Sequence, residues 1–180
     1  QIEDYPRLFS KSDSTGNSGE EWSIIYNAVS DQLQLEMHWS STKGFWYTNL
    51  PQKDEWTHIV IYYNSSSVSY DPEIYFNRVP QTITETFSPS GTRPDDSSKD
   101  LLIGIVDSLI HDFKGKIDEI MMFNRSLSNE EIKSLYVTGS LDHRNDGVGV
   151  NWKLGQNSEV NFLEQNISVL DYGSKCSEDL

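Results

Sequence analysis

Residues 55–63 read Glu-Trp-Thr-His-Ile-Val-Ile-Tyr-Tyr, and this stretch decides the fold class. Its β-branched and aromatic side chains are typical of a central β-strand. A polar run at residues 64–67 ends the strand, and residues 72–77 read as its hairpin partner. We expect Pro80 to end this hairpin, because proline has no N–H to donate to a strand ladder.

The rest of the chain repeats the pattern of short strands separated by turns. In residues 32–39, Leu33, Leu35 and Met37 alternate with polar residues, which predicts a strand with one apolar face. Further strands are predicted at residues 7–11, 22–26, 45–49, 82–87, 101–106, 115–123, 149–154, 159–163 and 167–172. Ser128 and Glu131 form a capping box, which predicts one short helix near residues 129–136. About a dozen strands and one helix indicate an all-β fold, a β-sandwich or jelly roll.

The chain is strongly acidic. Its 180 residues carry 28 acidic and 14 basic side chains, a formal net charge of −14. This charge argues against a nucleic-acid partner, whose phosphates need a basic surface, and against anionic membranes. Membrane insertion is not expected, since the sequence has no apolar run of roughly 18 residues. The chain begins at Gln1 rather than Met, and we expect it to be processed or excised from a longer protein.

Four segments, in chain order, resemble the laminin G-like, concanavalin A-like lectin-glucanase jelly-roll family. They are Leu-Phe-Ser-Lys at residues 8–11, the strand at 55–63, Ile-Tyr-Phe-Asn at 74–77, and the block at 113–132. The last block is the most specific, because Gly-Lys-Ile-Asp-Glu at 115–119 leads into Asn-Arg-Ser-Leu-Ser at 124–128. The resemblance covers about residues 7–137 and implies a jelly-roll β-sandwich that works outside the cell.

The chain departs from the family pattern in two places. Arg78 stands where the family usually has glycine, so we expect a longer or wider hairpin than a type I′ turn. The family's opening strand is missing before the segment at 8–11, whereas residues 149–154 look like one. We therefore expect residues 1–140 to form the sandwich, and residues 141–180 to be an extension that completes this sandwich or a neighbour's. Val150, Trp152 and Leu154 should then be buried, with self-association through the terminal strands as the alternative to closure within the chain.

The sequence contains no recognisable set of catalytic residues. Asp118 and Glu119 are neighbours on an expected strand and should point to opposite faces, so they cannot act as an acid and base pair. For Asp118, a structural hydrogen bond and a calcium ligand both stay open, the latter because related proteins bind calcium; Asp171 is the second candidate ligand. The acidic loop at residues 94–100 should be solvated, with a calcium role as the weaker reading.

Aromatic residues and sequons supply the remaining candidates. Trp39, Trp46 and Tyr47 either stack on sugars or belong to the core. Asn64, Asn124 and Asn166 lie in Asn-X-Ser sequons and could carry glycans. The single cysteine, Cys176, is either a free thiol or pairs with another chain.

These observations favour an extracellular, non-catalytic binding module whose partner is a glycan or the surface of a cell-surface or extracellular protein. The alternatives are a structural repeat or filament subunit of a cell-surface assembly, and an ancillary domain of a larger carbohydrate-active enzyme. Calcium is the expected cofactor, if there is one.

Overall fold

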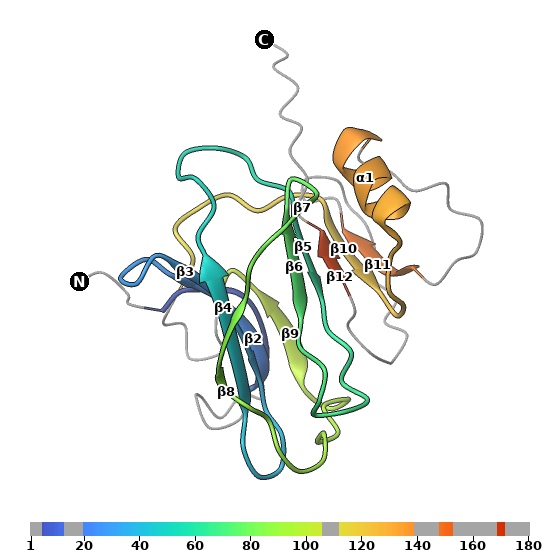
Figure 1. The fold of residues 1–180 in the computed structure, drawn as a ribbon. Coiled ribbons are helices and arrows are strands. Elements are labelled where there is room, and N and C mark those ends of the chain that lie inside the picture. Colours follow the sequence, from blue (N-terminus) through green and yellow to red (C-terminus); the bar gives the residue numbers. More distant parts are fainter. Residues whose placement is uncertain (1–4, 13–19, 106–111, 139–147, 153–168, 172–180) are drawn as a thin grey trace. The chain divides into compact units, whose positions relative to one another are not determined.

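A computed structural model describes residues 5–12, 20–105, 112–138, 148–152 and 169–171 (Figure 1). These residues form antiparallel sheets and one short helix, so the all-β prediction is confirmed. The chain divides into two compact units. The first comprises Gln1–Leu50, Ser65–Asp71 and Thr82–Lys116, and the second comprises Pro51–Asn64, Pro72–Gln81 and Ile117–Leu180. The described part of the chain holds no helix long and apolar enough to span a bilayer.

The first unit is built on a six-stranded sheet with the order β8-β4-β3-β2-β1-β9. Its strands are β1 (Arg7–Ser12), β2 (Glu20–Asn27), β3 (Gln32–Met37), β4 (Gly44–Asn49), β8 (Thr84–Phe87) and β9 (Asp100–Ile103). All neighbouring strands run antiparallel, and β1 to β4 follow one another directly along the chain. Each strand lies within a few residues of a predicted one, because the alternation of apolar and polar residues marks it clearly.

One face of this sheet is apolar. The register aligns Ile24 with Leu35 and Leu35 with Trp46, and cross-strand partners project from the same face. All three side chains are buried, as are Leu33 and Met37. The face predicted from the alternation in residues 32–39 is therefore the core face of the sheet.

The second unit contains two three-stranded sheets and the helix. Its elements are β5 (Ile59–Tyr62), β6 (Glu73–Phe76), β7 (Val79–Pro80), β10 (Ile120–Phe123), α1 (Asn129–Thr138), β11 (Val148–Trp152) and β12 (Val169–Asp171). Strand β10 lies between β11 and β12, and β12 lies next to β5. The core of the unit is a cluster of Val60, Met121, Phe123, Ile132 and Leu135.

The helix begins as predicted. The Ser128 hydroxyl accepts the N–H of Glu131 at 3.2 Å, and the Glu131 carboxylate accepts the N–H of Ser128 at 2.8 Å. The carboxylate also binds both terminal nitrogens of Arg125, at 2.7 and 3.0 Å. Three donors therefore converge on one carboxylate and fix the first turn of α1.

The hairpin between β6 and β7 corrects the prediction of a longer turn. Asn77 and Arg78 alone connect the strands, with φ values of 47° and 65°. Asn77 stabilises this tight turn: its side-chain oxygen accepts the N–H of His58 at 2.9 Å, and its own N–H donates to the His58 carbonyl at 2.8 Å. Pro80 is the last residue of β7, as predicted for the end of the hairpin. It lies in the outermost strand of the sheet, where its missing N–H leaves no gap in the ladder with β6.

Two predicted strands begin several residues later in the structure than expected. The strand expected at residues 55–63 begins only at Ile59. The strand expected at 115–123 begins at Ile120, because Glu119 has a φ of 50°, which is incompatible with an extended strand.

The C-terminal strands pair within the chain. Met122 lies opposite Val150 of β11 and opposite Leu170 of β12, so β10 has a backbone neighbour on each side. The predicted strand at 159–163 lies outside the described residues, as does Leu154. The boundary at residue 140 and the burial of Val150 and Trp152 stay predictions.

Candidate functional site

The second face of the six-stranded sheet is polar near its centre. The register places Ser10 beside Ser23, Ser23 beside Glu36, Glu36 beside Phe45, and Phe45 beside Phe87. We call these five residues, together with His38 and Lys43, the polar-face site. A row of small polar and charged groups that ends in two phenylalanines is unlike the apolar face of the same sheet.

Glu36 is the centre of the polar-face site. Its carboxylate oxygen Oε1 lies 2.8 Å from Nε2 of His38 and 2.7 Å from Nζ of Lys43. The Glu36 side chain is 11% exposed, whereas those of His38 and Lys43 are 34% and 43% exposed. Two partly exposed donors therefore flank one nearly buried acceptor.

The environment of Glu36 keeps its carboxylate ionised. Burial is the largest single influence and acts to raise the pKa of Glu36. Hydrogen bonds and charge interactions with His38 and Lys43 together outweigh burial, so the pKa of Glu36 lies below its ordinary value. The carboxylate is thus a permanent hydrogen-bond acceptor at neutral pH.

Two aromatic rings border these polar groups. The rings of Phe45 and Phe87 meet edge to face, with centroids 6.3 Å apart and planes at 72°. The Lys43 ammonium lies 5.9 Å from the centroid of the Phe45 ring. Phe87 is 53% exposed. An exposed ring beside fixed donors and acceptors suits a ligand that has an apolar face and several hydroxyl groups.

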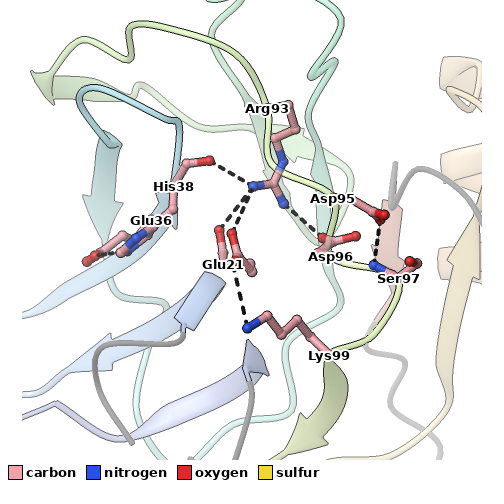
Figure 2. Close-up of polar contacts among 8 residues, drawn as sticks. All are labelled: Glu21, Glu36, His38, Arg93, Asp95, Asp96, Ser97 and Lys99. Carbon is pink, nitrogen blue, oxygen red and sulfur yellow. Dashed lines mark hydrogen bonds and ion pairs between the residues drawn. The ribbon is translucent and has the colours of Figure 1, made fainter. Parts of the chain in front are cut away.

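Arg93 braces the site from a loop that is distant in sequence (Figure 2). One terminal nitrogen donates to the carbonyl of His38 at 2.7 Å and to the carbonyl of Glu21 at 3.3 Å. The other donates to the Asp96 carboxylate at 2.9 Å. The Glu21 carboxylate lies 3.9 Å from Arg93 and 4.0 Å from Lys99. This network holds the backbone of His38, whose ring in turn binds Glu36.

The same loop also follows the connection between β3 and β4. The N–H of Ser40 donates to the Thr92 carbonyl, and the N–H of Thr92 donates to the Ser40 hydroxyl, both at 2.9 Å. Thr42 and Ser90 form a backbone bridge at 3.0–3.2 Å. The connection that carries His38 and Lys43 is therefore held at several points.

The expectation of a solvated loop at residues 94–100 is right only in part. Asp95 and Ser97 are exposed, and the hydrogen bond from the Ser97 N–H lowers the pKa of Asp95. Asp96 and Lys99 are half-buried, because they pair with Arg93 and Glu21.

The predicted sugar-stacking residues separate into core and surface. Trp46 is 0% exposed and donates its indole N–H to Asp71 at 2.8 Å, and Trp39 is 9% exposed. Neither buried ring offers a face to a sugar, so for these two residues the structure agrees with the core alternative. Tyr47 is half-buried, lies beside Gln34 on the polar face, and keeps its predicted role.

Of the two predicted calcium ligands, only Asp118 has a side chain that the structure describes. Asp118 accepts the N–H of Glu119 at 2.8 Å, which is the structural alternative. Asp118 and Glu119 both precede β10, so they do not lie on opposite faces of a strand as expected. Among the described side chains, no three His, Cys, Asp or Glu residues gather as a metal would require. Asp171 lies in β12, and its side chain is outside the described set.

The sequons differ in accessibility. Asn124 is exposed and Asn64 is half-buried. Asn166 and Cys176 lie outside the described residues. Of the two described sequons, Asn124 is the more accessible to a glycosyltransferase.

Sequence reasoning named none of the seven residues of the polar-face site as candidates. The alternation of side chains along a strand could have indicated some of these residues. If Trp46 faces the core, then Phe45 and Tyr47 face the other way. The same rule places Glu36 opposite Leu35.

Comparison with known families gave one match. A family model described as the concanavalin A-like lectin/glucanases superfamily matches residues 2–133. This match confirms the resemblance seen in the sequence and, with it, the jelly-roll β-sandwich fold class. No curated protein and no solved structure matches the chain.

Proposed function

Because the chain belongs to the concanavalin A-like lectin/glucanases superfamily, we propose that it is a non-catalytic extracellular module that binds glycans on its polar-face site. The observation that carries this proposal is the position of Glu36, hydrogen-bonded to His38 and Lys43, beside Phe45, whose ring meets the exposed ring of Phe87. A sugar would lay its C–H face on the ring and direct its hydroxyls to the charged groups.

The electrostatics of the site favour neutral sugars. Within the site, the Lys43 ammonium is balanced by the Glu36 carboxylate. The chain as a whole carries a net charge of −14, which repels sulfated and carboxylated glycans. The ligand class that fits is therefore an uncharged oligosaccharide.

The lowered pKa of Glu36 makes this residue unsuited to the general-acid role in glycoside hydrolysis. Glycosidases need a carboxylic acid whose pKa is raised, so that it holds a proton to donate to the leaving group. The pKa of Glu36 is lowered instead. Asn124, exposed and within a sequon, adds support for a secreted or cell-surface location.

The test is a glycan array of neutral and acidic oligosaccharides, probed with the full chain. We expect binding to neutral glycans, with a loss of about tenfold or more in affinity for Phe87→Ala and for Glu36→Gln. Tyr70→Ala is the matched control, because Tyr70 is 47% exposed and lies outside the site. Unchanged glycan binding by both variants would show that the polar-face site is not the binding site.

The other partner classes predict different results. A structural repeat or filament subunit should bind no glycan and should self-associate in sedimentation experiments. An ancillary domain of a carbohydrate-active enzyme should bind the substrate of the enzyme encoded in the same gene.

Calcium is a separate proposal for Asp118 and Asp171. Since a bound ion stabilises the folded state by mass action, calcium should raise the melting temperature of the chain. The Asp118→Asn variant should lose that increment. Identical melting curves with calcium and with a chelator would contradict calcium binding by this chain.

A further inference from the structure

A second surface, in the other unit, presents a cation among apolar side chains. Arg78 of the β6–β7 turn lies with its guanidinium carbon 5.8 Å from the centroid of the Tyr136 ring. Tyr136 is 42% exposed, and its neighbour on α1, Val137, is 56% exposed. Val79, next to Arg78, is 57% exposed. We call Arg78, Val79, Tyr136 and Val137 the Arg78 surface.

Arg78 and Tyr136 are both positioned by the same buried residue, His58. Asn77 exchanges hydrogen bonds with the backbone of His58, which sets the position of the turn that carries Arg78. The ring of His58, only 1% exposed, lies 5.7 Å from the ring of Tyr136. Arg78 and Tyr136 are therefore held in place before any ligand arrives, which lowers the entropy lost on binding.

The backbone of Arg78 is strained. At a φ of 65° it adopts the left-handed conformation in which glycine is favoured and other residues cost roughly 1 kcal/mol or more. Strain of this kind is often a sign of function, when the side chain it positions has a task. Glycine would make the same turn without strain but would supply no guanidinium.

Arg78 also makes no ion pair with the described part of the chain, although acidic residues outnumber basic ones 28 to 14. Its N–H donors are therefore available to an external carboxylate. Arginine and tyrosine are the residue types that most often dominate the binding energy of protein interfaces.

We propose that the Arg78 surface binds a segment of a partner protein in which a carboxylate is flanked by apolar side chains. The carboxylate pairs with the Arg78 guanidinium, while the apolar side chains cover Val79, Tyr136 and Val137. A sugar fits less well, because the two valines offer no hydrogen bond to its hydroxyls. A nucleic acid fits less well, because it would bring many phosphates to a chain with a net charge of −14, whereas the proposed segment brings one carboxylate.

The test selects peptides from a randomised phage-displayed library on the full chain. We expect enriched peptides to carry Asp or Glu beside Leu, Ile, Phe or Trp. Synthetic versions should bind at least tenfold more weakly to Arg78→Gly and to Tyr136→Ser. Arg78→Gly relieves the backbone strain, so its loss of binding cannot be attributed to misfolding.

Two controls complete the experiment. Lys133→Gln removes an exposed charge from the same helix and should leave peptide affinity unchanged, as should Phe87→Ala in the polar-face site. Peptides that bind Arg78→Gly as well as the unsubstituted chain would overturn the proposal. Heparin binding that depends on Arg78 would equally overturn it, in favour of an acidic glycan.

Discussion

The indole N–H of Trp46 donates to the Oδ1 atom of Asp71 at 2.8 Å, across 25 residues of sequence. Trp46 lies in the middle of β4 with no exposed surface, whereas Asp71 is exposed, so a buried donor finds its acceptor at the surface. The bond ties the segment Ser65–Asp71 to the six-stranded sheet, within the first unit. Tryptophan is often found in sugar-binding sites, but here the Trp46 side chain has a structural role.

Asp71→Ala should therefore lower the free energy of unfolding by about 1–2 kcal/mol, the cost of removing a partner from a buried donor. Asp71→Asn keeps an oxygen acceptor and should cost less. Urea denaturation of the three proteins measures both effects, and an alanine variant as stable as the parent would show that the bond contributes nothing.

Replacing Arg93 should loosen the loop that braces the polar-face site. Arg93→Gln removes the charged donor from the carbonyls of Glu21 and His38, which should cost about 1–3 kcal/mol of unfolding free energy. Limited proteolysis should then cut within residues 88–99 more quickly. Lys99→Gln is the control, because its 4.0 Å ion pair with Glu21 is the weaker contact. Equal cleavage rates in both variants would contradict the bracing role.

Two substitutions of Arg78 separate its backbone strain from its contact with Tyr136. Arg78→Gly relieves the left-handed strain but loses the contact with Tyr136, so stability should rise by about 0.5 kcal/mol. Arg78→Ala keeps the strain and loses the same contact, so stability should fall by a similar amount. The difference in melting temperature between the glycine and alanine variants measures the backbone strain at residue 78. An alanine variant no less stable than the glycine variant would argue against strain.

Glu131 should make the stability of the helix region depend on pH. The hydrogen bond from Arg125 lowers the pKa of Glu131 from 4.5 to about 2, helped by the N–H of Ser128. Since the folded pKa is the lower one, the stabilisation is complete above pH 4.5 and is lost as the pH falls toward 2. Glu131→Gln should cost about 1 kcal/mol at pH 7 and almost nothing at pH 2. An equal loss of unfolding free energy at both pH values would contradict the role of the Glu131 charge.

Removing residues 141–180 should expose β10. All four residues of β10 are buried, and its two backbone neighbours, β11 and β12, both come from the deleted segment. Unpaired edges on a buried strand favour aggregation, so the truncated chain should be insoluble or markedly less stable. Size-exclusion chromatography and thermal melts provide the measurement. A soluble, monomeric fragment with an unchanged melting temperature would show that the C-terminal strands are dispensable.

Local patterns predicted the elements that depend on local forces. Alternation placed Leu33, Leu35 and Met37 on one buried face, and the capping box located α1. Contacts between distant residues could not be predicted in the same way. The turn at Asn77 depends on a hydrogen bond to His58, 19 residues earlier, and the position of His38 depends on Arg93, 55 residues later. The polar-face site was missed for this reason, because its geometry comes from strand register and from a remote loop.

Pro80 has a consequence for the chain at high concentration. The N–H of Gln81 donates inward to the Ile74 carbonyl, so the nitrogen of Pro80, one residue earlier, points away from β6. That outward position carries a ring in place of a hydrogen, and a further strand laid along β7 would find no donor there. Sheet growth from this side is thereby blocked sterically, whatever the solution conditions, and crowded copies of the domain gain protection from fibre formation that does not depend on their mutual charge repulsion.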